Sequence, residues 1–448
     1  MAKAKTAYVC SECGAHAVKW QGQCPDCEAW NTLERTSVAG SAPSATVAGP
    51  VAQSLGSLTD DAGLRHATGF VEFDRVLGGG LVPGAVVLLG GDPGVGKSTL
   101  LQQVAAALPS ELGVCYATGE ESLRQIAQRA HRLGLENATL KLLADTSLDN
   151  LLAQAAALGS RALVIDSIQT MAAADVPSAA GSVSQLRECV SRIVKFAKQH
   201  EVATFLIGHV TKEGAIAGPR VVEHMVDTVL YFESDPASRY TIVRAVKNRF
   251  GASSEMGVFA MTDTGFREVR NPSAIFPPRE DAGAAGSIVT AAWEGSRPLL
   301  VEIQALVADG GGNYTRRLAQ GIEQNRLAVR VAVLQRHGGI QLEGEDVFVN
   351  VVGGLRRAEN AADLPSVLAI VSSYRDRRSR GELVCFGEIG LAGEVRPVRY
   401  GGERLREAAK QGYRAAIVPA SNVPKKKVRN IEVMGVRRLD EAIDAAFD

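Results

Sequence analysis

One short stretch of the sequence has the residue types and the spacing of a phosphate-binding loop. It fits the pattern GxxxxGK[ST] at every fixed position and consists of Gly91, Asp92, Pro93, Gly94, Val95, Gly96, Lys97, Ser98 and the following Thr99. Glycines let successive backbone N–H groups turn towards phosphate oxygens, and the helix after the loop presents its positive end to the same anion. In this pattern Lys97 reaches the β- and γ-phosphates, and the Ser98 hydroxyl binds Mg²⁺. We therefore predict that the loop binds a nucleoside triphosphate together with Mg²⁺.

Carboxylates at the ends of two apolar runs are the candidates for the remaining chemistry. The run 163–165 ends at Asp166, where a carboxylate that holds Mg²⁺ through water belongs, and Glu120 and Glu121 follow the run 114–118. Hydrolysis mostly requires a positioned water and stabilised charge, so Glu120 is the first candidate to activate the water and Glu121 the second. The alternative for either is a carboxylate favoured by the dipole of the next helix. His209, after the run 203–208, is either a γ-phosphate sensor or a polar strand end.

Four cysteines near the N-terminus have the spacing of a metal site. Two CxxC turns separated by ten residues contain Cys10, Cys13, Cys24 and Cys27. Four thiolates suit tetrahedral Zn²⁺, and the residues between them are too few to form a core without metal. We predict a structural zinc site, with an iron–sulfur cluster and a redox dithiol pair as alternatives. We expect Trp20 and Trp30 to form a small apolar cap, and the module to recognise a partner or DNA.

The elements that must position these residues alternate between strand and helix. Between residues 64 and 271, apolar runs of strand length alternate with helical patterns, the clearest of which spans 183–200. This alternation predicts a parallel sheet covered by helices. Because ligands of such sheets gather at the carboxyl ends of the strands, the phosphate loop and the carboxylates should lie close together.

Length and composition indicate several α/β domains. The 448 residues correspond to roughly three domains. We expect a zinc module (1–36), a linker rich in Ala, Ser, Gly and Pro (37–62), an ATPase domain (63–272), a second linker (273–286) and a C-terminal domain (287–448). The 49 basic and 49 acidic residues balance, so nucleic-acid binding would have to come from local basic patches. Without a long apolar stretch or a signal-peptide pattern, the chain is expected to be cytoplasmic, with no membrane partner.

The core resembles the RecA family, and the whole chain resembles the bacterial RadA (Sms) family. The resemblance rests on the four cysteines and on residues 68–74, 78–80, 209–214, 218–227 and 247–251. It implies an ATP-driven ring, a hexamer, that moves on single-stranded DNA and extends or branch-migrates recombination intermediates, with a RecA-type recombinase as partner. In such rings ATP lies between subunits, which implies that Lys247 and Arg249 act on a neighbour's γ-phosphate. The residues alone leave a solvated charge run as an equal alternative. Lys212 and Arg220 would face DNA in the ring channel.

The C-terminal region resembles the Lon protease domain. We expect strands at 287–293, 299–306, 347–352 and 384–389, an arginine-rich helix at 314–336 and a helix at 364–373. Residues 387–397 resemble a Lon strand segment, and Ser366 falls where Lon carries its nucleophile. Lon has a lysine base after a Gly-Gly pair, whereas Glu403 and Arg404 follow Gly-Gly here, and an arginine stays protonated. We therefore expect a non-proteolytic domain that holds the ring together. The helix arginines form either a solvated face, interface bridges or a DNA contact, and they are Arg316, Arg317, Arg326, Arg330 and Arg336. Residues 425–429 form either a DNA contact or a solvated loop.

Two other functions stay open from the sequence. A RecA-fold ATPase that acts on a protein client would hydrolyse ATP at a rate indifferent to DNA. An ATP-dependent serine peptidase would require Ser366 to act as a nucleophile despite the missing lysine.

Overall fold

The structure is a computed structural model that describes residues 5–10, 16–17, 19–25, 28–38, 64–208, 221–234, 240–274, 284–310, 315–352 and 359–447. By their internal contacts the residues form two units, Met1–Arg270 and Asn271–Asp448. The domain boundaries expected above stay predictions. Cys13, Cys27, His209, the loop 212–220 and most of the two expected linkers lie outside the described residues.

The N-terminal residues form a small antiparallel sheet with the strand order β2-β1-β3. Its strands are β1 (Lys5–Cys10), β2 (His16–Ala17) and β3 (Leu33–Val38). Cys10, at the end of β1, and Cys24 are buried in a core of very few residues. Trp20 and Trp30 are 57% and 70% exposed, so the expected apolar cap is wrong. A module this small has too little core to enclose two indole rings.

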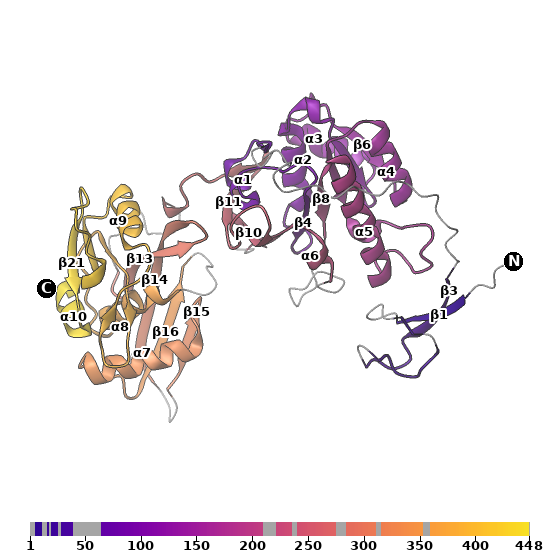
Figure 1. The fold of residues 1–448 in the computed structure, drawn as a ribbon. Coiled ribbons are helices and arrows are strands. Elements are labelled where there is room, and N and C mark those ends of the chain that lie inside the picture. The colour runs from indigo at the N-terminus through magenta and orange to yellow at the C-terminus, as the bar shows by residue number, and fades with distance from the viewer. Residues whose placement is uncertain are drawn as a thin grey trace, which may run out of the picture. The chain divides into compact units, whose positions relative to one another are not determined.

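A nine-stranded sheet with the order β12-β11-β10-β9-β4-β8-β7-β5-β6 forms the centre of the first unit (Figure 1). The strands β9, β4, β8, β7, β5 and β6 are parallel, as the alternation of strands and helices predicts, whereas β10, β11 and β12 are antiparallel. The parallel strands are β4 (Val86–Gly90), β5 (Cys115–Thr118), β6 (Lys141–Ala144), β7 (Ala162–Asp166), β8 (Ala203–Ile207) and β9 (Thr228–Ser234). The antiparallel strands are β10 (Tyr240–Asn248), β11 (Met256–Thr262) and β12 (Gly265–Glu268).

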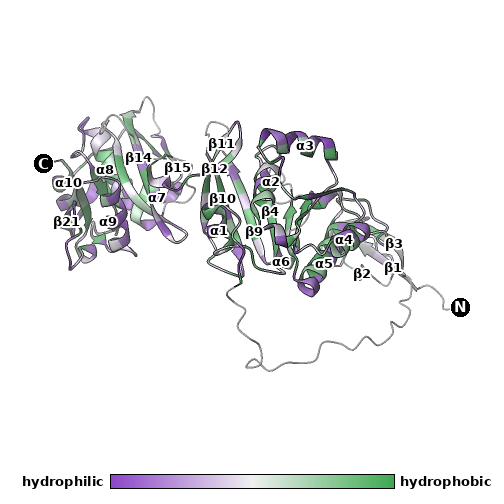
Figure 2. Ribbon diagram, turned by 90° about the horizontal axis from the view of Figure 1, so that it is seen from above, coloured by the Kyte–Doolittle hydropathy of each residue, from purple (hydrophilic) through white to green (hydrophobic). Residues whose placement is uncertain are grey.

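Helices cover both faces of this sheet. They are α1 (Val71–Leu77), α2 (Lys97–Ala107), α3 (Leu123–Arg132), α4 (Leu148–Ala157), α5 (Val183–His200) and α6 (Val221–Met225). Apolar residues of α1, α2 and α3 form one core cluster with the sheet, and those of α4 and α5 form another. Figure 2 shows hydrophobic strands inside and hydrophilic residues along α3, whose only buried residue is Ile126. The apolar stripe predicted for 183–200 is the buried side of α5.

The second unit contains a seven-stranded sheet with the order β15-β16-β14-β13-β17-β20-β21. Its strands are β13 (Ser287–Glu294), β14 (Arg297–Asp309), β15 (Arg317–Gln320), β16 (Glu345–Val351), β17 (Leu383–Cys385), β20 (Ala415–Pro419) and β21 (Glu432–Val436). A separate pair is formed by β18 (Glu388–Ile389) and β19 (Val395–Arg396). The helices are α7 (Gln324–His337), α8 (Asp363–Tyr374), α9 (Gly401–Lys410) and α10 (Leu439–Phe447).

Two expectations for this unit are wrong in detail. The helix expected at 314–336 is instead the strand β15 followed by α7, because residues 317–320 pair with β16 and Gly321, at φ +81°, ends the strand. The strand expected at 384–389 divides into β17 and β18, which belong to different sheets. In the part of the chain that the structure describes, no helix is both long and apolar enough to cross a bilayer.

Candidate nucleotide site and its surroundings

The phosphate loop connects β4 to α2, as the sequence predicts. Gly91, Gly94 and Gly96 have positive φ angles. A Cβ at Gly96 would lie 2.6 Å from the Phe266 ring, so this position requires glycine for space as well as for conformation. Lys97 is almost fully buried, and its Nζ donates to the carbonyl oxygens of Gly91 at 2.7 Å and Asp92 at 2.8 Å.

The electrostatics of Lys97 fit a polyphosphate ligand. Burial lowers the pKa of Lys97, and the nearby carboxylates of Asp166, Asp92 and Glu120 oppose that shift. A desolvated cation beside a glycine-rich loop of backbone N–H groups is a ready site for phosphate oxygens.

Asp166 ends β7 and is 4% exposed. The Tyr116 hydroxyl donates a hydrogen bond of 2.7 Å to its Oδ2. Burial raises the pKa of Asp166, whereas hydrogen bonds from Tyr116 and Ser98 lower it. A hydroxyl and a carboxylate in contact at the start of α2 are oxygen ligands of the kind that Mg²⁺ prefers, so Ser98 and Asp166 fit the predicted metal role.

Glu120 and Glu121 have different surroundings, which the sequence could not distinguish. Glu121 forms a two-pronged ion pair with Arg129, with oxygen–nitrogen distances of 2.7 and 2.9 Å. Glu120 is exposed, and the Ser167 hydroxyl donates to its Oε1. Because β5 and β7 pair with Thr118 opposite Asp166, Glu120 lies next to the end of β7. Of the two carboxylates, Glu120 is therefore the one that contacts Ser167, the residue directly after Asp166.

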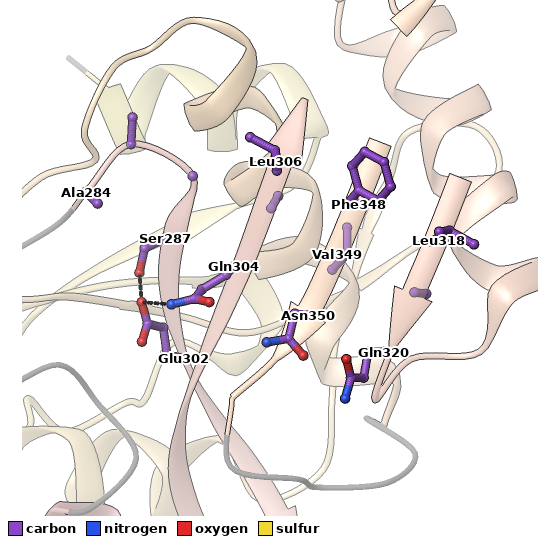
Figure 3. A pocket seen from close by; sticks show the side chains of 14 residues that line it. Ala284, Ser287, Glu302, Gln304, Leu306, Leu318, Gln320, Phe348, Val349 and Asn350 are labelled. Carbon is purple, nitrogen blue, oxygen red and sulfur yellow. Dashed lines mark hydrogen bonds between the residues drawn. The ribbon is translucent and has the colours of Figure 1, made fainter. Parts of the chain in front are cut away.

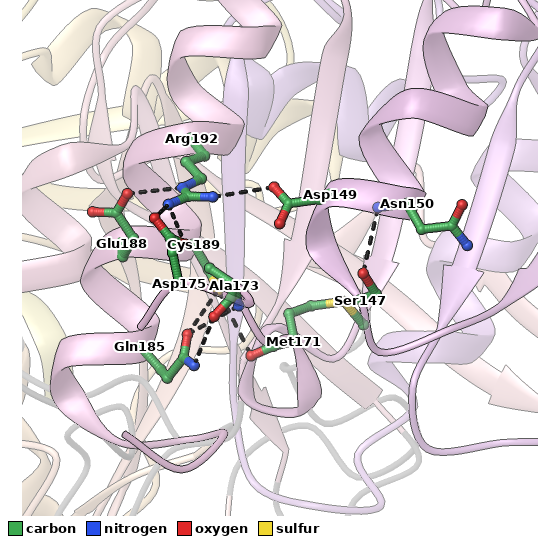
Figure 4. Close-up of polar contacts among 10 residues, drawn as sticks. All are labelled: Ser147, Asp149, Asn150, Met171, Ala173, Asp175, Gln185, Glu188, Cys189 and Arg192. Carbon is green, nitrogen blue, oxygen red and sulfur yellow. Dashed lines mark hydrogen bonds and ion pairs between the residues drawn. The ribbon is translucent and has the colours of Figure 1, made fainter. Parts of the chain in front are cut away.

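The segment after Asp166 is fastened to α5 by two side chains (Figure 4). Gln185 is buried, accepts from the Ala173 N–H at 3.1 Å and donates to three carbonyl oxygens between residues 173 and 178. Arg192 forms ion pairs with Asp149 of α4, with Glu188 of its own helix and with Asp175 in the segment. Hydrogen bonding to Arg192 lowers the pKa of Asp175. These contacts fix the chain that leaves β7 directly after Ser167.

Lys247 and Arg249 lie at the amino ends of the parallel strands, opposite the ends from which the phosphate loop leaves. Because β10 is antiparallel to β9, Lys247 lies opposite Val229, near the amino end of β9, after a β-bulge at residue 246. The side chain of Arg249 lies 3.5 Å from Asp227, which also accepts from the N–H of Val86, the first residue of β4. The phosphate loop leaves the opposite end of β4, about 13 Å away at 3.3 Å per residue. These two cations and the phosphate loop of the same chain are therefore not brought together.

Lys247 is occupied by backbone groups in the single chain. Its Nζ donates to the carbonyl oxygens of Glu223, His224 and Val226, at 2.9, 3.1 and 2.8 Å. Burial and the nearby Arg249 charge lower the pKa of Lys247. Carbonyls at the end of a helix are natural partners of a cation.

Ser366 and Arg404 are both buried in the second unit. Ser366 lies in the first turn of α8, is fully buried, and donates to the Ala362 carbonyl oxygen at 2.5 Å. Arg404 is also fully buried, and Glu359 accepts two of its N–H groups. The residue in place of the Lon lysine is thus the cation of a structural ion pair.

Arg330, one of the helix arginines for which a solvated face, interface bridges and DNA contact stay open, is buried and pairs with Asp363, so neither a solvated face nor DNA contact fits it. Its position on the inner side of α7 requires an acidic partner, because a buried unpaired charge is costly.

A hollow of about 590 Å³ lies on one face of the seven-stranded sheet of the second unit (Figure 3). Pairing of β14, β16 and β15 places Gln304, Asn350 and Gln320 in one cross-strand row. The next row on that face contains Leu306, Phe348 and Leu318. Alternation along each strand produces both rows. No motif in the sequence marks these residues.

Three sequence families match parts of the chain. Residues 8–35 match the family described as a rubredoxin metal binding domain, residues 67–215 match the AAA domain, and residues 318–422 match subunit ChlI of Mg-chelatase. Together with the nine-stranded and the seven-stranded sheet, these matches confirm the predicted fold class: an N-terminal zinc-ribbon module, a RecA-like ATPase core and a C-terminal Lon-like α/β domain.

Full-length relatives and solved structures are also similar to this chain. The crystal structure of the RadB recombinase matches with 21% identity and a TM-score of 0.37, covering 46% of this chain and 99% of that chain. The DNA repair protein RadA of Pseudomonas aeruginosa is 52% identical over 454 residues, and that of Escherichia coli K12 is 52% identical over 461, each covering 100% of both chains. The protein of the same name from Bacillus subtilis is 45% identical over 456 residues and covers 99% of both chains. This chain belongs to the RadA family of DNA repair proteins.

Proposed function

We propose that the chain is a DNA-dependent ATPase that works as a homo-oligomeric ring, a hexamer, with each ATP bound between two copies. The observation that carries the proposal is the distribution of charged residues over one sheet. Lys97, Asp166 and Glu120 lie at the carboxyl ends of the parallel strands, whereas Lys247 and Arg249 lie at their amino ends. Each copy would therefore contribute a phosphate loop to one ATP site and the cations Lys247 and Arg249 to another, and assembly of the copies would complete both sites.

The roles of the residues follow from their surroundings. Lys97 would hold the β- and γ-phosphates, assisted by the N–H groups of residues 91–99. Mg²⁺, when held by Ser98 and Asp166, neutralises phosphate charge. Glu120, fixed by the Ser167 hydroxyl, would orient the attacking water and accept its proton.

The second copy would supply the remaining charge. Its Arg249, with Lys247, would stabilise the negative charge that develops on the γ-phosphate. An arginine supplied in trans accelerates phosphoryl transfer by about 10³–10⁵ in nucleotide hydrolases, so an isolated chain should turn over slowly.

We propose single-stranded DNA as the activator and substrate of this motor. With 49 basic and 49 acidic residues, binding would depend on local cations rather than on net charge. Lys425, Lys426, Lys427 and Arg429 are exposed before β21, and contacts of this kind bind phosphates without reading sequence. The name of the relatives supports a role in DNA repair, here as extension or branch migration of recombination intermediates produced by a RecA-type recombinase in the cytoplasm.

The other two domains would support this activity. We propose that Cys10, Cys13, Cys24 and Cys27 bind one structural Zn²⁺, a role supported by the burial of Cys10 and Cys24 and by the rubredoxin-type match. The Lon-like domain would act in assembly without proteolysis, because Ser366 is buried and Arg404 is held by Glu359.

The deciding experiment measures ATP turnover with and without single-stranded DNA across a salt series, with Lys97→Ala as the blank. We expect DNA to stimulate turnover and the stimulation to fade as salt rises, because phosphate contacts release counterions. Turnover that is unchanged by DNA would contradict the motor and point to a protein client. Turnover retained by Lys97→Ala would contradict the phosphate-loop assignment.

A further inference from the structure

Asp227 ends the motif 218–227 and has no role in the site described so far. It lies between α6 and β9, and its side chain is 6% exposed. Three groups from distant parts of the chain meet its carboxylate. The Val86 N–H donates to Oδ2 at 3.0 Å, Lys198 Nζ lies 2.7 Å from Oδ2, and Arg249 Nη1 lies 3.5 Å from Oδ1.

The two cations around Asp227 reach out of the protein. The Lys198 side chain is 47% exposed and that of Arg249 is 59% exposed, although both contact a buried carboxylate. The main chains of the two residues are in contact as well, since the Arg249 N–H donates to the Asp227 carbonyl oxygen at 3.2 Å. A guanidinium has five N–H donors, so a contact through Nη1 leaves others for a phosphate.

The same short segment also holds Lys247. The three carbonyls that accept from its Nζ belong to residues 223, 224 and 226, directly before Asp227. Residues 223–227 thus determine where both cations of the 247–251 motif lie.

We propose that Asp227 is a positioning residue that aims Arg249 at the ATP of a neighbouring copy. This inference rests on the function proposed above, in which Arg249 acts in trans. Through the Val86 N–H, the same carboxylate is joined to the first residue of β4, whose other end leads into this copy's own phosphate loop. The donor half-site and the acceptor half-site of one subunit are therefore connected by a single strand.

Asp227→Asn isolates this role. The amide keeps an oxygen for the Val86 N–H but loses the charge that attracts Arg249. We expect kcat to fall about tenfold to a hundredfold, because displacing a positioned group by about 1 Å has an effect of that size. The Kd of a fluorescent ATP analogue should change by less than about twofold, because the phosphate loop that binds it is intact. The matched control is Glu233→Gln, which removes the ion pair of Glu233 with Arg244 on β9 and β10, the strands that Asp227 and Arg249 flank, and should leave kcat unchanged.

Mixing experiments separate this inference from the proposed function. A 1:1 mixture of Asp227→Asn with Lys97→Ala should regain turnover, because the intact loop of the first then faces the intact Arg249 of the second. Arg249→Ala mixed with Lys97→Ala should regain it too. Recovery only in the Arg249→Ala mixture, or an unimpaired Asp227→Asn protein, would overturn the role of Asp227 and leave the ring site standing. Recovery in neither mixture would overturn the arrangement in trans, and with it both proposals. If Asp227→Asn does not fold, Asp227→Ser takes its place in the same assays.

Discussion

Replacing Glu120 by glutamine should separate nucleotide binding from hydrolysis. The residue lies two positions after the end of β5, next to the end of β7, and the buried Ser167 hydroxyl donates to its carboxylate. Glutamine has nearly the same shape and can still accept that hydrogen bond. It cannot accept a proton from water, so only the chemical step should suffer.

The size of the effect follows from the role. A positioned general base contributes about 10²–10⁴ in rate, so kcat should fall at least about a hundredfold, or about 2.7 kcal/mol in activation free energy. Glu120 is exposed, so the free energy of unfolding should change by less than about 0.5 kcal/mol. Removing one negative charge near the phosphates should leave nucleotide binding intact or slightly tighter.

Glu121→Gln is the matched control on the neighbouring residue. It breaks the ion pair with Arg129, whose Nε also donates to Gln102 at 2.7 Å. Since Glu121 is partly exposed, we expect a stability loss of about 1 kcal/mol at most and a change in turnover below about tenfold.

Single-turnover hydrolysis, binding of a fluorescent ATP analogue and urea unfolding together test this pair. An inactive Glu121→Gln protein beside an active Glu120→Gln protein would reverse the assignment. Full activity of both variants would mean that neither carboxylate activates the water. It would refute the idea that hydrolysis at this site depends on a carboxylate as proton acceptor.

Three further predictions concern buried polar groups and the cysteines. Tyr116→Phe should raise the Mg²⁺ concentration needed for analogue binding and lower the free energy of unfolding by about 1–3 kcal/mol at neutral pH, because the hydroxyl stabilises the charged form of Asp166. The loss of unfolding free energy should shrink in acid, where Asp166 is protonated. Urea unfolding at several pH values measures this trend, and its absence would contradict the prediction. Arg404→Ala should cost about 2–3 kcal/mol of unfolding free energy by removing the buried cation that binds Glu359, which is partly exposed and keeps its hydrogen bond from the Trp293 N–H. A loss below about 1 kcal/mol would argue against a structural ion pair. Cys24→Ser should release Zn²⁺ to a chelating dye, and iron or no metal in the unaltered protein would refute the zinc site.

The parts of the site that could be predicted are those fixed by local pattern and by one rule of topology. The spacing of residues 91–98 defines a turn whose backbone binds phosphate, independent of the rest of the chain. Asp166 follows an apolar run, and the carboxyl ends of parallel strands share an edge. Ser98 and Asp166 do lie in hydrogen-bond contact.

What could not be predicted depends on pairs far apart in the chain. Tyr116 and Asp166 are 50 residues apart and meet because β5 and β7 are neighbouring strands. The local sequence around Tyr116 indicates only an apolar strand and does not signal this contact. Arg404 and Glu359 are 45 residues apart, and no local spacing signals that they pair. The amphipathic pattern of residues 314–336 predicts one helix, whereas pairing with β16 makes residues 317–320 a strand.

The position of Lys247 shows how strand direction decides at which end of the sheet a residue lies. Like Asp166, it lies near the carboxyl end of its own strand, so in an all-parallel sheet both residues would lie at the nucleotide edge. The strand β10 instead runs antiparallel to β9, and this reversal carries Lys247 and Arg249 to the amino edge. One change of direction thus separates the cations from the phosphate loop of their own chain. In the proposed ring, such a chain would complete its ATP site by presenting the amino ends of these strands to the phosphate loop of another copy.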